Sequence, residues 1–125
     1  MPSYDTRFAP PAPLLDVQIV NPHQPAQFTF HPALLDTAAD ITAIPRAVAH
    51  ELYLQSIRTI SVAGVDGLFV HHPSYIVTLV VADTTFDRMQ AIEWLGEEVL
   101  LGRDVLNEFE IKLDGKIWQF EIRDP

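Results

Sequence analysis

The sequence contains no cysteine among its 125 residues. This absence excludes disulfides, thiolate metal ligands and a cysteine nucleophile. Basic residues are scarce as well, with 8 Lys+Arg against 17 Asp+Glu and a formal net charge of −9. Such a chain repels nucleic acid and anionic membrane surfaces, and no cluster of lysine and arginine offsets the repulsion. We therefore expect neither nucleic acid nor a membrane among its partners.

Long apolar segments are also missing. The longest apolar run, residues 75–82, has the length of a strand, whereas a helix that crosses a bilayer needs about 20 apolar residues. The N-terminus has no basic region followed by an apolar stretch, so no secretory signal is visible. We accordingly expect a cytoplasmic protein.

Proline is concentrated near the N-terminus. Four of the ten prolines fall within residues 1–13, and this composition predicts an extended arm that is mobile in isolation. The remaining residues, 14–125, are enough for one domain with its own hydrophobic core. We therefore divide the chain into a proline-rich arm and a single folded domain.

Short apolar or alternating segments separated by turn residues dominate that domain. They predict strands at residues 15–20, 27–31, 58–63, 68–71, 74–82, 89–94, 98–101, 109–113 and 116–122. Pro32 should end the second strand, Gly64 to Gly67 predicts a hairpin, and Asp114-Gly115 predicts a tight turn. Helix is expected only at 45–52 and 103–109. Many short strands with two short helices favour an all-β, barrel-like fold.

One acidic residue occupies an unusual position. Asp36 follows the apolar residues 33–35 and precedes a loop of small residues, Thr37 to Asp40. Burying a lone carboxylate is costly unless it is hydrogen-bonded or protonated. Two such carboxyls in contact can share one proton, so that one activates a water and the other protonates a carbonyl oxygen. Considered without other motifs, Asp36 is better explained as a turn-forming acid at a strand end.

A second segment, downstream of Asp36, favours an active-site role for this residue over a turn. Residues 33–40, followed by Ile44-Pro45, resemble the active-site loop of the retropepsin-like aspartic proteases, which reads apolar-apolar-Asp-Thr/Ser-Gly-Ala. Residues 99–106 resemble the apolar-apolar-Gly-Arg-Asn/Asp segment and C-terminal helix of the same family. The order and spacing of these motifs agree with those of the family from residue 15 to residue 122. The hairpin expected around Asp114-Gly115 is more similar to cellular and bacterial members than to the viral enzymes.

The resemblance implies a single-lobed acid-protease fold, a closed barrel with a flap hairpin and one short C-terminal helix. It implies an aspartic endopeptidase that works as a homodimer on a peptide or protein substrate, without a metal or cofactor. Asp36 would be the catalytic carboxyl, and Thr37 would form a hydrogen bond with the Thr37 loop of the other subunit. Ala38 stands where the family has glycine, which is a departure within the catalytic loop.

The resemblance also implies how substrate is held. The backbone at Ala38 and Asp40 would bind the peptide main chain, and Arg103 would form a structural ion pair with Asp40. The flap hairpin would close over the peptide with Gly64, Val65, Asp66 and Gly67. The alternative function is a catalytically weak or inactive dimeric module of the same fold that binds peptides or only dimerises, because Ala38 and the acidic surface fit either function.

Other residue patterns support weaker hypotheses. Asp83 also precedes a threonine after an apolar strand, but no small residues follow, so a surface turn is the better interpretation. His50-Glu51 begins like a zinc-protease helix, yet Leu54 stands where the second histidine is required. His71 and His72 are neighbours on a strand and point to opposite faces. We therefore expect no metal, and a serine hydrolase is unsupported because no Gly-x-Ser-x-Gly motif exists.

Overall fold

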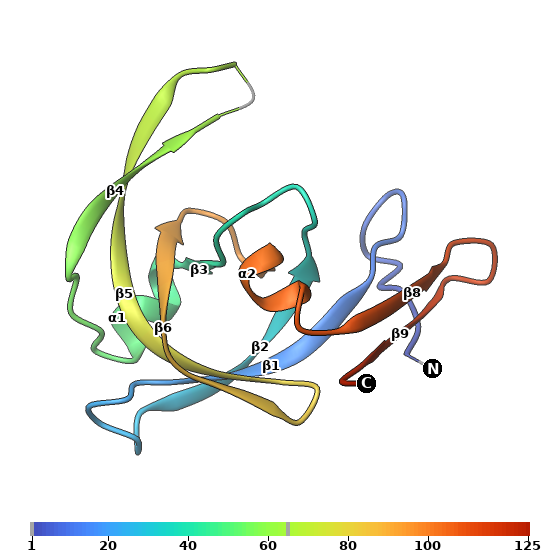
Figure 1. Ribbon diagram of the computed structural model, residues 1–125, viewed down its shortest axis with the longest axis horizontal. Coiled ribbons are helices and arrows are strands. Elements are labelled where there is room, and N and C mark those ends of the chain that lie inside the picture. Colours follow the sequence, from blue (N-terminus) through green and yellow to red (C-terminus); the bar gives the residue numbers. More distant parts are fainter. Residues whose placement is uncertain (1, 65) are drawn as a thin grey trace.

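The computed structural model describes residues 2–64 and 66–125. It is built mostly of strands, as the sequence predicts (Figure 1). The elements are β1 (Leu14–Val20), β2 (Phe28–Leu35), β3 (Ala43–Pro45), α1 (Arg46–Glu51), β4 (Arg58–Ala63), β5 (Phe69–Val81), β6 (Thr84–Trp94), β7 (Val99–Leu101), α2 (Arg103–Leu106), β8 (Glu110–Asp114) and β9 (Gln119–Arg123). Within the described residues, no helix is long and apolar enough to cross a membrane.

Six strands close into a barrel. Their order is β1-β2-β7-β3-β6-β5, and β5 pairs back with β1. The pairs β2–β7 and β3–β6 are parallel, whereas β1–β2 and β5–β6 are antiparallel. β4 pairs with β5 outside this ring, and the two strands form a hairpin that projects away from the barrel (Figure 1). The predicted closed barrel with a flap hairpin and a short helix before the C-terminal strands is confirmed.

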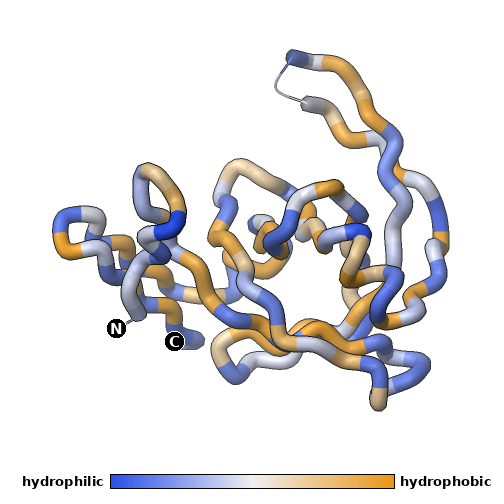
Figure 2. The backbone as a smooth tube through the Cα atoms, turned by 180° about the vertical axis from the view of Figure 1, so that it is seen from behind, coloured by the Kyte–Doolittle hydropathy of each residue, from blue (hydrophilic) through white to orange (hydrophobic). Residues whose placement is uncertain are grey.

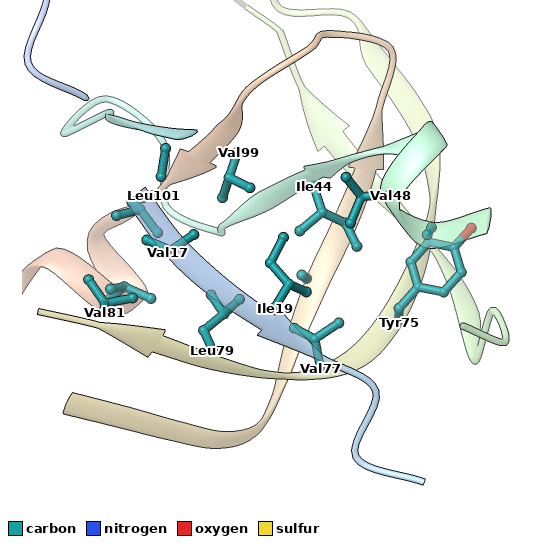
Figure 3. Close-up of a cluster of buried hydrophobic side chains, with 14 of the residues drawn as sticks. Val17, Ile19, Ile44, Val48, Tyr75, Val77, Leu79, Val81, Val99 and Leu101 are labelled. Carbon is teal, nitrogen blue, oxygen red and sulfur yellow. The ribbon is translucent and has the colours of Figure 1, made fainter. Parts of the chain in front are cut away.

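Alternating aliphatic side chains fill the barrel. Val17 and Ile19 of β1 are at most 1% exposed, because every second residue of a strand points to the same face. Figure 3 shows them together with buried residues from β3, α1, β5 and β7, namely Ile44, Val48, Val77, Leu79, Val81, Val99 and Leu101. Burying each such side chain contributes roughly 1.5–3 kcal/mol. This packing makes the barrel a rigid support for the loops at its ends.

Two prolines lie within strands that the sequence analysis ended or divided. β2 continues through Pro32 to Leu35, and β5 is one strand of 13 residues that includes Pro73. In each case a neighbouring ladder begins at the next residue, with β7 pairing from Ala33 and β6 pairing from Ser74. A residue without an amide hydrogen is tolerated where only one neighbouring strand is present. The prediction that Pro32 ends its strand is therefore wrong.

Turn lengths and helix ends also differ from expectation. Asp114 pairs with Gln119, so the turn between β8 and β9 spans the four residues 115–118 and is wider than predicted. α2 ends at Leu106, before the predicted end at Phe109. β6 already begins at Thr84, and the turn before it is Ala82-Asp83, whose φ angles of 47° and 65° suit a two-residue hairpin. Asp83 thus lies in a structural turn.

The N-terminal arm is attached to the last strand. The Tyr4 amide donates to the Trp118 carbonyl at 2.7 Å, and the Phe120 amide donates to the Pro2 carbonyl at 3.0 Å. The Tyr4 ring packs against Phe120, with 6.2 Å between ring centroids, and Phe120 is fully buried. The proline-rich arm therefore packs on the last strand, because Phe120 offers it an apolar surface.

Candidate active site

Asp36 is the first residue after β2, and its position is set by a neighbouring strand. Leu35 lies opposite Leu101 in the parallel β2–β7 pair, and the Asp36 amide donates to the Leu101 carbonyl at 3.0 Å. The Asp36 side chain is half-buried. The loop that it begins rises on the side of the barrel from which the β4–β5 hairpin projects (Figure 1). Asp36 therefore lies at the end of a strand, as the sequence pattern predicts.

The loop after Asp36 accommodates alanine without backbone strain. The Ala38 amide donates to Asp36 Oδ1 at 3.1 Å, and the Ala39 amide donates to the Asp36 carbonyl at 3.3 Å. Ala38 is not among the non-glycine residues with positive φ. The position therefore does not require a glycine-only conformation. Thr37 and Ala38 are exposed in the single chain.

A buried threonine joins the far end of this loop to α2. The Thr42 hydroxyl donates to Asp104 Oδ1 at 2.7 Å, and the Thr42 amide donates to Asp104 Oδ2 at 3.0 Å. The same hydroxyl accepts the Gly102 amide at 3.1 Å. Thr42 is 0% exposed and its bond with the Gly102 amide is buried, whereas Asp104 is exposed and its carboxylate keeps contact with water. Neither Thr42 nor Asp104 was expected to have a role, and the only sequence signal of their contact is the Asp that follows Gly-Arg.

Gly102 marks a close approach of two chain segments. A Cβ at this position would lie 2.8 Å from the Ile41 carbonyl carbon and 3.1 Å from the Ala39 carbonyl oxygen. Both atoms belong to the backbone and cannot move aside easily. The next amide, that of Arg103, donates to the Ala39 carbonyl at 2.8 Å. The glycine of the Gly-Arg segment is therefore required by the path of the Asp36 loop.

The predicted ion pair between Asp40 and Arg103 is not formed. Arg103 donates from a terminal guanidinium nitrogen to the Thr37 carbonyl at 2.7 Å. Among the described residues the ion pairs are Arg7–Asp5, Arg46–Glu93 and Arg123–Glu110. Asp40 is exposed, so water solvates its carboxylate and pairing would contribute little. Arg103 thus contacts the Asp36 loop through a backbone carbonyl of that loop.

The β4–β5 hairpin has the predicted glycine turn. The Gly64 amide donates to the Leu68 carbonyl at 2.8 Å, and Asp66 Oδ1 accepts the Leu68 amide at 2.9 Å. Gly67 has a φ of 79°, which favours glycine. Val65 lies outside the described residues. Beyond the turn, apolar side chains are open to solvent, with Leu68 67% exposed and Phe69 69% exposed.

A buried polar cluster lies at the base of this hairpin. Tyr75 donates its hydroxyl to Glu93 Oε1 at 2.7 Å, and Arg46 donates to Glu93 Oε2 at 3.0 Å. Burial alone would raise the pKa of Glu93, but the hydrogen bonds from Tyr75 and Arg46 outweigh it and lower that pKa. Burial, then the bond to Glu93, raises the pKa of Tyr75 to about 12. The cluster joins α1 to β5 and β6, and no sequence motif indicated it.

The closed barrel, with a flap hairpin above an Asp-Thr loop that crosses a Gly-Arg turn, defines the retropepsin-like class of acid-protease folds. The family model described as aspartyl protease matches residues 27–105, a segment that includes both the Asp36 loop and Gly102. The chain therefore belongs to the aspartyl protease family. Among curated proteins, no sequence matches the chain.

Solved structures agree with this assignment. The EIAV protease complexed with the inhibitor HBY-793 is 25% identical, with a TM-score of 0.58, over 77% of this chain and 86% of that one. The simian foamy virus protease is 19% identical, with a TM-score of 0.57, over 76% of this chain and 92% of that one. The second likeness bears on the fold alone. Both support a single-lobed barrel of the retroviral type.

Proposed function

We propose that this protein is an aspartic endopeptidase that acts as a homodimer, with Asp36 of each subunit forming the catalytic pair. The observation that carries the proposal is the setting of Asp36. Its backbone is held by β7 and its Oδ1 accepts the Ala38 amide, while no hydrogen bond to Oδ2 is found within the described residues. One chain supplies one such loop, and an acid pair needs two. A two-fold axis beside the loop supplies the second.

The chemistry follows from two carboxyls that share one proton. The ionised Asp36 takes a proton from a water held between the two subunits, and the water oxygen attacks the peptide carbonyl carbon. The protonated Asp36 gives its proton to the carbonyl oxygen, which yields a neutral tetrahedral intermediate. As the carbon–nitrogen bond breaks, the Asp36 that took the water proton gives it to the leaving nitrogen, and the other Asp36 accepts a proton from a hydroxyl of the intermediate, which restores the singly protonated pair. No covalent bond to the enzyme forms.

Substrate would lie between the loop and the flap hairpin. Ala38 and Asp40 are exposed residues, and their backbone groups would bind the main chain of an extended peptide. The hairpin around Gly64, Asp66 and Gly67 would close from the other side. The exposed Leu68 and Phe69 give this hairpin apolar surface that a peptide side chain can cover.

The test compares wild type with Asp36→Asn on a mixed peptide library at mildly acidic pH. Asparagine keeps the shape of the side chain but cannot accept the proton from water, so cleavage should fall by at least about 100-fold. Asp83→Asn is the matched control, because it changes the other Asp-Thr pair in a turn where asparagine tolerates positive φ. Retained activity in Asp36→Asn would end the proposal. Peptide binding without cleavage in wild type would favour the inactive peptide-binding module.

A further inference from the structure

A hollow of about 240 Å³ lies between the β1–β2 turn and the segment that joins α1 to β4, together with Ile76 of β5. Both segments lie on the side of the barrel opposite the β8–β9 hairpin (Figure 1). In Figure 2 the β1–β2 turn is mostly hydrophilic, whereas the α1–β4 segment contains both hydrophilic and hydrophobic residues. The volume is slightly below the roughly 300–1,000 Å³ of pockets that hold drug-sized ligands. A single ring with its substituents is therefore the size of ligand that fits.

A buried asparagine fixes the two walls of this hollow. Asn21 is 3% exposed. Its side-chain amide nitrogen donates to the Leu52 carbonyl at 2.9 Å, and its Oδ1 accepts the His23 amide at 2.9 Å. These bonds join the β1–β2 turn to the end of α1. The hollow is therefore formed by the fold itself, as is usual for ligand sites.

The polar lining of the hollow carries no formal charge. Gln24, Gln55 and His23 line it, and among the described residues no Asp, Glu, Lys or Arg does. The side chains of Gln24 and Gln55 are exposed and make no hydrogen bond with another described residue. A carboxamide presents donors and an acceptor side by side, which matches a pair of neighbouring hydroxyl groups. The lining therefore suits a neutral ligand that carries hydroxyls.

Tyr53 lines the hollow in a conformation that tyrosine rarely adopts. It follows Leu52, the C-cap of α1. The Tyr53 amide donates to the His50 carbonyl at 3.2 Å, and the Leu54 amide donates to the Ala49 carbonyl at 3.0 Å. Glycine is the usual residue at this position of such a helix end, because φ is positive, here 56°. Tyr53 is 67% exposed, so packing within the chain does not account for it, and a strained residue beside a hollow indicates a functional site.

We propose that this hollow binds a neutral sugar ring. The face of the Tyr53 ring would cover the C–H groups on one side of the sugar, because tyrosine combines an apolar body with a polar end. Ile57 and Ile76 supply apolar surface to the same hollow. The carboxamides of Gln24 and Gln55 would bind hydroxyls at the edge of the sugar ring.

Other ligand classes fit this lining less well. A charged ligand would find no opposite charge in it, and removing a charge from water without a partner is costly. A purely apolar ligand would take water from the carboxamides without replacing its hydrogen bonds. A neutral ring with hydroxyls avoids both costs. No residue of the Asp36 loop lines the hollow, so the inference stands apart from the proposed function.

Isothermal titration calorimetry with the methyl glycosides of glucose, galactose, mannose and N-acetylglucosamine tests the proposal. At least one glycoside should bind the wild type. Cyclohexanol keeps a six-membered ring but has one hydroxyl, so it should bind at least about tenfold more weakly. A matching disaccharide that binds more tightly than the glycoside would assign the hollow to a glycan chain, and equal affinity would assign it to a single sugar.

Three results of these titrations would overturn the sugar site. The first is a wild type that binds none of the four glycosides. The second is binding of cyclohexanol as tight as that of the best glycoside. The third is binding of N-acetylprolinamide in place of the glycosides, which would show that the hollow accepts the ring of a peptide.

Tyr53→Gly separates strain from binding. Glycine adopts positive φ freely, so the variant should melt about 2–5 °C above wild type and bind the glycoside at least about tenfold more weakly. Trp118→Gly is the matched control, because Trp118 has a φ of 53° and is 49% exposed but lies in the β8–β9 turn. It should bind the glycoside as wild type does. Equal affinities of the two variants, or a Tyr53→Gly protein that melts below wild type, would overturn the role of Tyr53.

Replacing the carboxamides tests the polar contacts. Methionine keeps the length of a glutamine side chain and removes its hydrogen-bonding groups, so Gln24→Met and Gln55→Met should each weaken glycoside binding by about threefold to tenfold. Gln18→Met, on β1 and outside the lining, should leave the affinity unchanged. Full affinity in both Gln24→Met and Gln55→Met would overturn the assignment of a hydroxyl-bearing ligand.

Discussion

Replacing Thr42 by valine removes one hydroxyl and very little else. That hydroxyl donates to Asp104 at 2.7 Å and accepts the Gly102 amide at 3.1 Å. A hydrogen bond to a charged group contributes about 1.5–3 kcal/mol, and a buried amide left without an acceptor costs about 1–3 kcal/mol. Asp104 is exposed and still accepts the hydrogen bond from the Thr42 amide in the variant. The loss of the hydroxyl bond to Asp104 should therefore cost an amount near the lower end of the range of about 1.5–3 kcal/mol. We expect Thr42→Val to lower the free energy of unfolding by about 2–4 kcal/mol.

Urea denaturation of wild type and variant measures this loss. Thr85→Val is the matched control, because Thr85 is an exposed threonine on β6, and it should change stability by less than about 0.5 kcal/mol. Turnover per folded molecule should also fall in Thr42→Val, since the loop bearing Asp36 loses an attachment to α2. A destabilisation below about 1 kcal/mol would refute the reasoning, because the Gly102 amide would then have found another partner.

Two further predictions concern the Arg103 contact and the cluster below the flap. In a double-mutant cycle, the changes in unfolding free energy caused by Arg103→Ala and Asp40→Ala should add within about 0.5 kcal/mol, since Arg103 binds the Thr37 carbonyl. A coupling energy above about 1 kcal/mol would instead show that Arg103 and Asp40 interact. Tyr75 has a folded-state pKa of about 12 against a reference value of 10.0, so its contribution to stability is complete below pH 10 and is lost as the pH rises toward 12. Tyr75→Phe should therefore show a smaller alkaline decline in unfolding free energy than wild type, and parallel pH profiles would contradict this.

The barrel and the location of the Asp36 loop could be predicted because they depend on local pattern. Alternating residues such as Val17 and Ile19 identify a half-buried strand directly. An acid that follows three apolar residues marks a strand end. The strand limits at Pro32 and Pro73 were mistaken because they depend on where neighbouring strands begin, which local sequence does not contain.

Side-chain partners were harder to predict than elements. The family resemblance predicts that Arg103 pairs with Asp40. Its guanidinium instead donates to the carbonyl of Thr37, a residue three positions before Asp40. The choice between the two depends on the path of an exposed loop and on the solvation of a carboxylate. The contact of Thr42 could not be predicted because a buried threonine just before a short strand has no distinctive pattern. Its role arises from a contact with Asp104, 62 residues further along the chain.

The anchoring of Asp36 by β7 has a consequence for biosynthesis. The strands β2 and β7 pair although more than 60 residues separate them, as Ala33 opposite Val99 shows. Such long-range pairing forms late, because closing a large loop costs entropy before any stabilising contact is made. A chain emerging from the ribosome therefore carries Asp36 on an unanchored loop until Leu101, Gly102 and Asp104 have been made. Incomplete chains contain Asp36 but not the segment that supports it, so the proposed catalytic pair cannot be assembled before residues 99–104 have been made.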